Sequence, residues 1–374
     1  MRSHTPAWLR WGGMTLLMVV LVALPFMNEA FRVNQFIKWM CLAVAAAGLN
    51  LLTGYNGQIS VGHGALYGLG AYTSALIVVH STTPMLLTIV AAAVVCFFAG
   101  VLIGVPALRI KGLYLALVTL AVAVLFPEIL DQFSSRTGGR IGQSMSDPQP
   151  DCPRGRPECP IRWESPISGL AEDQWRYFIV LAITVAMFVL VANVVRSRVG
   201  RSLVAIRDNE VAAETSGVHV ARTKIITFGL SAAIAGVGGA MLALLNGNPR
   251  VNPGSFELLV SIYLLVAIVV GGPATIIGPA IGAAVYGIFT DVIAPELPGN
   301  YENATPVILG VLLVVQMLIA PNGNAGQCKD LHARIAAKRR GVDNDSTGTP
   351  SGEPTGGAGG AEADIQAVAN PGGT

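Results

Sequence analysis

Two short clusters of glycine, proline and polar residues interrupt long apolar stretches in different halves of the sequence. The first is Gly54-Tyr55-Asn56-Gly57-Gln58, and the second is Gly271-Gly272-Pro273 followed by Gly278-Pro279. In an apolar medium, a helix break frees backbone amide and carbonyl groups, which can then bind a polar solute. The chemistry that these clusters favour is therefore the binding and passage of a solute, and not the making or breaking of bonds.

The polar side chains beside the two breaks are candidate contacts along a substrate pathway. For most of them, an equally compatible interpretation is that they only satisfy backbone groups at a tight turn. For His63, hydrogen-bonded packing is favoured over substrate contact or pH sensing. The predicted pathway residues are Thr53, Asn56, Gly57, Gln58, Ser60, His63, Gly272, Thr275 and Gly278.

The composition is that of an integral membrane protein. Of the 374 residues, 52% are apolar and only 12% are charged, about half the charged share of a typical soluble domain. Crossing a hydrocarbon core of roughly 30 Å takes about 20 apolar residues. The fold class expected is therefore all-α, a polytopic transmembrane bundle of about ten spans. The predicted spans are 11–27, 36–54, 60–79, 85–106, 112–130, 175–195, 225–246, 255–272, 274–293 and 304–320.

Lysine and arginine predict the orientation of the chain. With the N-terminus inside, 15 of the 24 basic residues fall in cytoplasmic segments. An even number of spans then places both termini in the cytoplasm. The predicted domains are a cytoplasmic N-terminus at 1–10, a permease domain at 11–320 and a basic, then disordered, cytoplasmic tail at 321–374. Within the permease domain, residues 131–174 form an outer loop and residues 196–224 a cytoplasmic segment.

The outer loop contains two cysteines, Cys152 and Cys159. A loop outside the cell permits a disulfide between them, and two free thiols are the alternative. Their spacing is too wide for a zinc knuckle, and there is no cluster of His, Cys, Asp and Glu for another metal. No metal and no cofactor are therefore predicted.

The cytoplasmic segment contains an amphipathic, helix-prone stretch at 201–214. Leu203, Ile206 and Val211 are predicted to form one apolar stripe, with charged residues around it, and Gly217 to end the helix. Such a short helix is suited to dock in a groove on a partner protein. The alternative, a helix lying on lipid headgroups, is disfavoured because the charges are of mixed sign.

The sequence lacks the residues that would power transport within the chain. It has no Gly-x-x-x-x-Gly-Lys-Ser/Thr loop to hold nucleotide phosphates, and no nucleophile–base pair, so no catalytic residue is predicted and the chain is not expected to be an enzyme. The carboxylates Glu128, Glu257 and Asp291 all fall at predicted span ends, whereas ion-coupled carriers usually need ionisable residues at depth. These absences favour a transporter that is driven by a separate protein.

Three motifs, in the same order, resemble those of the LivM-type permeases, the membrane subunits of ABC importers for branched-chain amino acids. The segment 48–65 resembles the family signature around the first break. The segment 200–217 is similar to the family's cytoplasmic coupling segment, except that Val211 precedes Ala212-Ala213 where the wider importer loop favours glutamate. The segment 271–279 is similar to the family's late Gly/Pro turn. The resemblance covers roughly residues 36–320.

The resemblance implies a multi-pass subunit of the bacterial plasma membrane that works with several partners. These are a LivH-type sister permease, two cytoplasmic ABC ATPase subunits that hydrolyse ATP, and an extracytoplasmic amino-acid-binding protein; nucleic acid is not among them. The alternative is a stand-alone secondary carrier or channel for small polar solutes. The residues implied to press into the ATPase are Arg207, Asp208, Glu210, Ala212, Ala213 and Gly217.

Overall fold

The computed structural model of the protein describes residues 18–81, 83–108, 113–144, 165, 169–246, 250–293, 310, 311 and 314. These residues all belong to one compact unit within 1–331. The structure is nearly all helical, and its one sheet among the described residues is a pair of two-residue strands. The helices are Met18–Met27, α2 (Ala30–Asn50), α3 (His63–His80), α4 (Met85–Ala107), α5 (Leu113–Gln132), α6 (Ser134–Thr137), α7 (Glu172–Arg196), α8 (Arg198–Asp208), α9 (Glu210–Thr215), α10 (Val220–Leu245), α11 (Leu258–Gly271) and α12 (Gly278–Ile288).

Shorter elements join these helices. A π-helical turn, Leu51–Tyr55, extends α2, and another, Phe289–Ile293, extends α12. Two 3-10 turns, Gly139–Ile141 and Pro253–Phe256, lie next to strands β1 (Gln143–Ser144) and β2 (Arg250–Val251). The strands pair antiparallel, with Gln143 opposite Val251.

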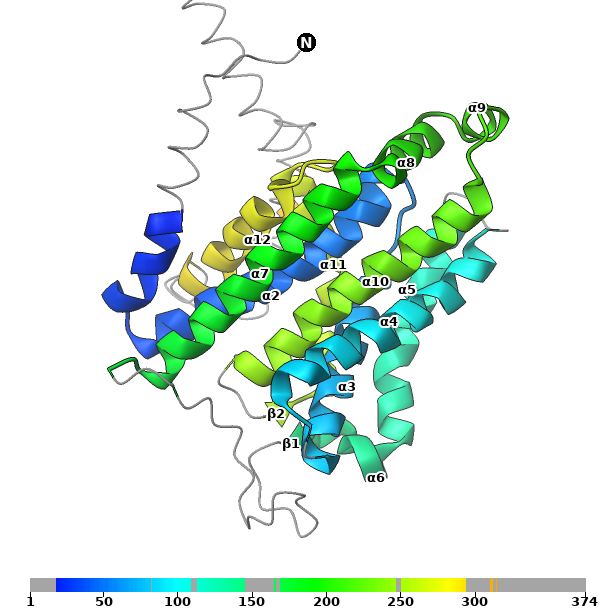
Figure 1. Ribbon diagram of the computed structural model, residues 1–374. Coiled ribbons are helices and arrows are strands. Elements are labelled where there is room, and N and C mark those ends of the chain that lie inside the picture. Colours follow the sequence, from blue (N-terminus) through cyan, green and yellow to red (C-terminus); the bar gives the residue numbers. More distant parts are fainter. Residues whose placement is uncertain are drawn as a thin grey trace, which may run out of the picture. The chain divides into compact units, whose positions relative to one another are not determined.

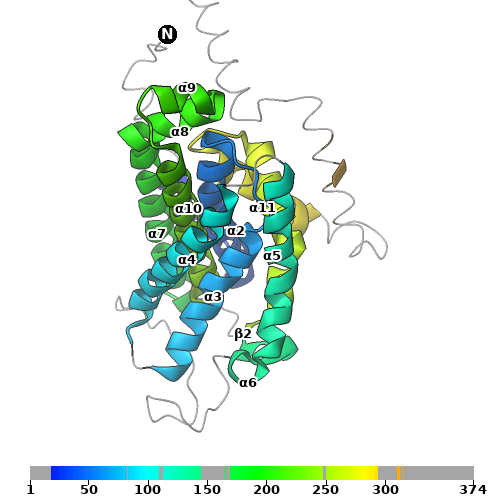
Figure 2. The same cartoon turned by 90° about the vertical axis from the view of Figure 1, so that its right-hand side faces the viewer.

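Helices α2 and α10 form the centre of the bundle. In the most apolar window of each helix, 67% of α2 and 83% of α10 is buried, against 28% of α4, 22% of α5 and 17% of α7. Figure 1 shows α2 and α10 side by side, and Figure 2 shows α5 and α7 on opposite flanks of them. The outer helices present their apolar side chains outward, as expected for surfaces in contact with lipid.

Close backbone contacts between small residues hold the central helices together. A Cβ atom on Gly70 of α3 would lie 2.2 Å from the carbonyl oxygen of Gly236 in α10. A Cβ atom on Gly282 of α12 would lie 1.7 Å from the carbonyl oxygen of Ala267 in α11. Neither position can accept a larger residue without moving a helix, and such contacts are the usual way that membrane helices associate.

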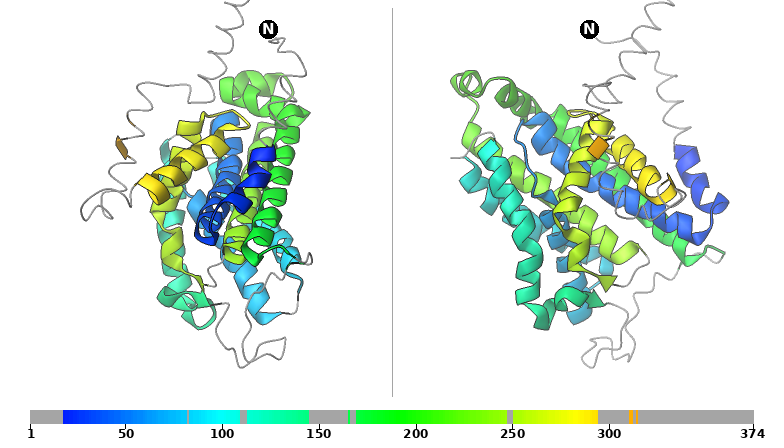
Figure 3. Two further views of the ribbon diagram at one scale, coloured as in Figure 1. Left: turned by 90° about the vertical axis from the view of Figure 1, so that its left-hand side faces the viewer. Right: turned by 180° about the vertical axis from the view of Figure 1, so that it is seen from behind.

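The remaining helices pack around this centre. Seen from behind in Figure 3, α11 and α12 lie beside α2. The helix Met18–Met27 packs on α7, where the Tyr177 hydroxyl donates to the Leu21 carbonyl over 2.8 Å. Near the middle of α2, the Trp39 indole N–H donates to the Asp291 carboxylate over 2.7 Å. Asp291 falls at the end of its helix, as the sequence predicts, and its carboxylate accepts this hydrogen bond from within the same chain.

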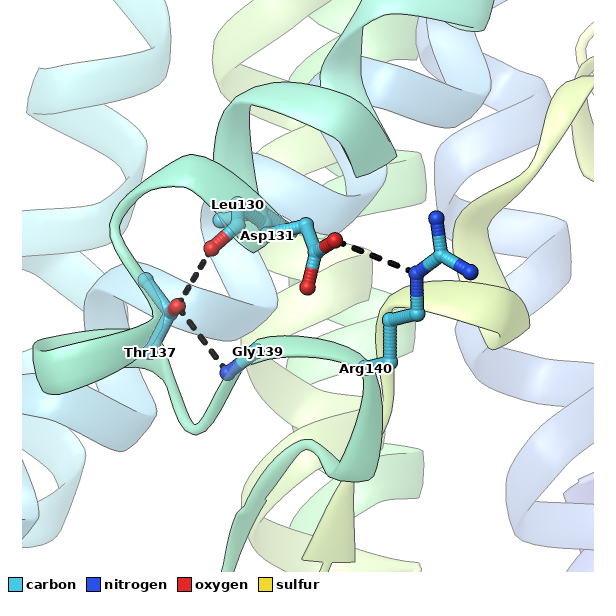
Figure 4. A network of polar contacts seen from close by, with 5 residues as sticks. All are labelled: Leu130, Asp131, Thr137, Gly139 and Arg140. Carbon is cyan, nitrogen blue, oxygen red and sulfur yellow. Dashed lines mark hydrogen bonds and ion pairs between the residues drawn. The ribbon is translucent and has the colours of Figure 1, made fainter.

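The two ends of the bundle contain different loops. The first break, α8, α9 and the second break lie at one end, whereas α6, β1 and β2 lie at the other (Figure 1). At the second end, the buried Thr137 hydroxyl donates to the Leu130 carbonyl over 2.6 Å and accepts from the Gly139 amide. Arg140 donates to Asp131 over 3.1 Å in the same turn (Figure 4). This network closes the chain back on itself at the end of α5.

The structure supports an all-α polytopic membrane protein. Within the part of the chain that the structure describes, six helices are long and apolar enough to span a bilayer, and Met18–Met27 and Gly278–Ile293 are shorter apolar helices. The predicted span 304–320 falls almost wholly outside the described residues. Helix α10 begins at Val220, within the predicted cytoplasmic segment 196–224, and both Val220 and Lys224 are buried.

Candidate functional site

The two helix breaks meet through one buried side chain, that of Asn50. The Asn50 amide donates from Nδ2 to the Thr275 carbonyl over 2.7 Å, and its Oδ1 accepts from the Ala274 amide over 3.0 Å. Asn50 is the last residue of α2 and is 1% exposed. A helix end and a turn that are far apart in the sequence are therefore joined by two hydrogen bonds.

The first break is a π-helical turn followed by a short loop. The Gln58 amide donates to the Leu52 carbonyl over 3.2 Å, and the Thr53 hydroxyl donates to the Gln58 carbonyl over 3.0 Å. Gly57 has φ +72°, a conformation that residues with a side chain rarely adopt. Asn56 donates to the Gln58 side chain over 2.9 Å, while its buried Oδ1 has no hydrogen-bond partner among the described residues. Asn56 and Gln58 thus form a polar pair inside the break.

The second break is held by its own threonine. The Thr275 hydroxyl donates to the Gly272 carbonyl over 2.7 Å and accepts from the Gly278 amide over 3.1 Å. Gly272 has φ +110°, and Ala274 has φ +55° although it is not a glycine. The predicted residues of this cluster are thus brought together, and the Thr275 side chain satisfies groups of its own turn.

Ser60 and His63 lie in a fully buried hydrogen-bonded chain. His63 Nε2 lies 2.7 Å from the Ser231 hydroxyl, which donates to the Gly48 carbonyl over 2.6 Å. Since the Ser231 proton is used in that bond, Nε2 carries the ring proton, and Nδ1 accepts from the Ser60 hydroxyl over 2.9 Å. Both residues are 0% exposed. This placement favours the packing interpretation for them.

The coupling segment is two short helices and not one. Asn209 separates α8 from α9 and caps α9, accepting at Oδ1 from the Ala212 amide over 3.0 Å. The predicted apolar stripe is not formed: Leu203 and Ile206 are buried against the protein's own helices, whereas Val211 is 71% exposed. The stripe prediction is wrong because these side chains cover the end of the bundle itself.

Two charged residues of this segment bind the bundle. The Arg207 guanidinium donates to the Gly54 carbonyl over 3.1 Å, and it also pairs with Asp208 over 3.2 Å. Glu210 pairs with the buried Lys224 of α10 over 2.8 Å. Both ends of the α8–α9 junction are therefore tied to the membrane helices.

The other predicted coupling residues differ in exposure. Asp208, Ala212 and Gly217 are exposed, whereas Ala213 is buried in a small apolar cluster with Ile206 and Val220. Gly217 has φ +86° and ends the segment, as predicted from its type. The exposed side of α9 and Asp208 thus form part of the outer surface of this segment.

A pocket of about 280 Å³ lies between the first break and the coupling segment. Two ion pairs, Arg207–Asp208 and Lys224–Glu210, contribute to its wall. Its lining residues are Asn56, Gly57, Gln58, Ile59, Leu115, Ile206, Arg207, Asp208, Asn209, Glu210 and Lys224. Three predicted pathway residues, Asn56, Gly57 and Gln58, therefore line the same cavity as three of the predicted coupling residues, Arg207, Asp208 and Glu210.

Asn50 and Ser231 are not among the site residues predicted from the sequence. Asn50 falls inside the first motif, and a polar side chain near the end of an otherwise apolar helix is itself a signal of function or of a required partner. Ser231 offers no such signal, because a serine in a membrane helix can satisfy its own backbone. The predicted disulfide between Cys152 and Cys159 concerns two residues outside the described part of the chain.

Comparison with known proteins identifies the family. The family described as branched-chain amino acid transport system / permease component matches residues 31–317. The high-affinity branched-chain amino acid transport system permease protein LivM of Salmonella typhimurium is 30% identical over 317 residues, covering 82% of this chain and 73% of that protein. LivM of Escherichia coli K12 shows the same identity and coverage.

A second type of permease is also similar. LivH of Escherichia coli K12 is 26% identical over 301 residues, covering 76% of this chain and 91% of that protein. The comparison with solved structures found no match. The match over most of the chain, and the higher identity to LivM than to LivH, show that this chain belongs to the branched-chain amino acid transport system permease family and is of the LivM type.

Proposed function

We propose that this chain is the membrane-spanning permease subunit of an ATP-driven ABC importer for leucine, isoleucine and valine in the bacterial plasma membrane. The observation that carries the proposal is the meeting of the two helix breaks at the end of the bundle where the coupling segment lies. Pairs of discontinuous membrane helices commonly form the solute site of a transporter.

Electrostatics within the site support an amino acid as the solute. A zwitterion needs donors for its carboxylate and acceptors for its ammonium group, and a broken membrane helix offers both as backbone amides and carbonyls. Asn56 and Gln58 add side-chain amides of both kinds at the first break. The apolar side chain of leucine, isoleucine or valine is compatible with the surrounding helices.

We infer the partners from the family to which the chain belongs and, for the ATPase, from the exposed surface of the coupling segment. A LivH-type sister permease would complete the pathway, the exposed side of α9 would bind one of the two ATPase subunits, and an extracytoplasmic protein would deliver the amino acid. The proposal also includes ten spans, both termini in the cytoplasm and the domains 1–10, 11–320 and 321–374. In this arrangement the chain binds no cofactor itself, because the ATPase subunits bind and hydrolyse the nucleotide.

Uptake by intact cells tests the proposal. Cells that lack only this chain should lose high-affinity uptake of radiolabelled leucine, and the intact gene should restore it. In restored cells, uptake should stop when ATP is depleted while the ion gradients are kept, and it should continue when an uncoupler collapses the gradients. The reverse response to the two treatments would contradict the proposal and support a secondary carrier.

A further inference from the structure

We propose that Asn50 is a positioning residue that, together with Arg207, links the coupling segment to both helix breaks. The inference deepens the proposed function and rests on it only where transport is measured. The contacts run from Arg207 to the Gly54 carbonyl, from Gly54 to Asn50, and from Asn50 to Ala274 and Thr275.

The first link is the contact between Arg207 and the first break. Besides the bond to the Gly54 carbonyl, the Arg207 side chain lies across Gly57, where a Cβ atom would approach its Cγ to 2.8 Å. The arginine thus holds both ends of the 54–57 loop. Any displacement of α8 that keeps this contact must move the loop as well.

The second link is the close approach of Gly54 to the Asn50–Ala274 pair. A Cβ atom on Gly54 would lie 2.2 Å from Asn50 Oδ1 and 2.5 Å from the Ala274 nitrogen. The π-helical turn therefore lies directly against the hydrogen bond that joins the two breaks. Packed groups at such distances cannot overlap. A displacement of the 54–57 loop must therefore either carry the second break with it or pull the two breaks apart.

The third link is the double hydrogen bond of Asn50, which fixes a strained turn. Ala274 has φ +55°, a left-handed conformation that is strained for a residue with a side chain. Strain of this kind persists only where neighbours hold it, and it collects at sites that switch between arrangements. Asn50 binds both the amide of Ala274 and the carbonyl of Thr275, so it is the neighbour placed to hold this turn.

A purely structural role for Asn50 predicts a different outcome from a linking role. If Asn50 only satisfies the second break, a change at Arg207 should leave the 271–278 turn unaffected. If the contacts act as a chain, loss of Arg207 should loosen both breaks. The pocket of about 280 Å³ beside Arg207 leaves room for the segment to move against the loop.

The first test needs neither ATP nor substrate. Hydrogen exchange is measured on the full chain in lipid nanodiscs for the wild type, Arg207→Ala and the control Arg201→Ala, the same change at an exposed position of α8. We expect Arg207→Ala to speed exchange about fivefold in both 54–58 and 271–278, including the Ala274 amide, whose bond to Asn50 is the last link. The control should change neither segment. Faster exchange in 54–58 alone would overturn the proposal.

The second test measures coupling in the reconstituted importer. Asn50→Leu keeps the approximate size of the side chain and loses both the acceptor for the Ala274 amide and the donor to the Thr275 carbonyl. We expect the ATP hydrolysed per leucine transported to rise about tenfold, as for loss of roughly 1.4 kcal/mol of interaction. The matched control is Asn28→Leu, because the Asn28 amide donates within its own helical turn, to Leu24. An unchanged ratio in Asn50→Leu would overturn the proposal.

The two tests separate the inference from the proposed function. A wild-type complex that shows no ATP-driven uptake would contradict the proposed function, while the exchange experiment would still decide on the link. If Asn50→Leu does not accumulate in membranes, Arg207→Ala takes its place in the coupling measurement, because the Arg207 side chain is more than a third exposed and its loss removes the bond to the Gly54 carbonyl and the pair with Asp208.

Discussion

The polar network around Asn50 and the network around Thr137 differ in how far apart in the sequence their bonded residues lie. The Asn50 bonds join residues that are 224 and 225 positions apart, and Arg207 reaches Gly54 across 153 positions. The bonds of Thr137 span two to seven positions, and the Arg140–Asp131 pair spans nine. The first network therefore fixes how separate helices lie relative to one another, whereas the second closes one turn of the chain.

This difference tells where a substitution should affect transport and where it should affect only stability. Breaking a bond between separate helices changes their relative position, which is what a transporter must control. Breaking a bond within one turn costs free energy of folding but leaves the paths of the helices unchanged. Four substitutions, from the largest expected effect to the smallest, test this contrast.

Gly54→Ala should have the largest effect. Its Cβ atom would overlap Asn50 Oδ1 and the Ala274 nitrogen, so the two breaks must separate. We expect leucine uptake to be lost and the free energy of unfolding to fall by roughly 1–3 kcal/mol. The control is Gly254→Ala near β2, where a Cβ atom would meet its nearest neighbours at an ordinary 3.5 Å. Equal losses of uptake and stability in the two variants would contradict the contrast between the two networks.

Val211→Arg should lower uptake without unfolding the protein. Val211 is 71% exposed on α9, so the change buries no charge, but it alters the surface offered to the ATPase. We expect about a tenfold loss of leucine uptake, as for roughly 1.4 kcal/mol of lost contact energy, at an unchanged melting temperature. Val199→Arg, at the exposed start of α8, is the matched control. Normal uptake in Val211→Arg would show that the ATPase binds elsewhere.

Thr137→Val should reduce stability while leaving coupling intact. The substitution keeps the shape of the buried side chain but removes the hydroxyl that bonds the Leu130 carbonyl and the Gly139 amide. Loss of such a group costs about 1–2 kcal/mol, which thermal unfolding in detergent can measure. The ATP hydrolysed per leucine should stay at the wild-type value. A changed ratio would show that this end of the bundle also takes part in coupling.

Arg140→Gln should have the smallest effect. The Arg140 side chain is 80% exposed and its ion pair with Asp131 is open to water. Exposed pairs of this kind contribute about 0.2–1 kcal/mol, and less at high salt. We expect a melting temperature within a few degrees of the wild type and normal uptake. A large loss of stability would mean that the turn in Figure 4 depends on charge and not on the Thr137 bonds.

The sequence allows the helix breaks and the coupling segment to be predicted because they depend on local residue types. Glycine and proline interrupt a helix wherever they cluster, and Gly217 ends a helix through its own backbone preference. Family resemblance at three motifs adds the order in which these segments occur. The membrane class and the all-helical fold follow from composition alone.

The partners of these residues could not be predicted in the same way. Asn50 binds the Ala274 amide and the Thr275 carbonyl, backbone groups that carry no residue signature, so no pattern in the sequence pairs them. For Arg207, charge and amphipathic spacing predict an exposed side chain, but they do not predict that its guanidinium binds the Gly54 carbonyl. Leu203 and Ile206 look like a docking stripe for the same reason, and the structure places them against the bundle because the end of the helices needs an apolar cover.

The most direct test of the central claim is leucine accumulation in vesicles of purified components. The account predicts that vesicles holding this chain, its sister permease, the two ATPases and the binding protein accumulate leucine against its gradient when ATP is supplied, and that an analogue resistant to hydrolysis does not support accumulation. Accumulation of leucine by vesicles that hold this chain alone, without ATP, would contradict the account.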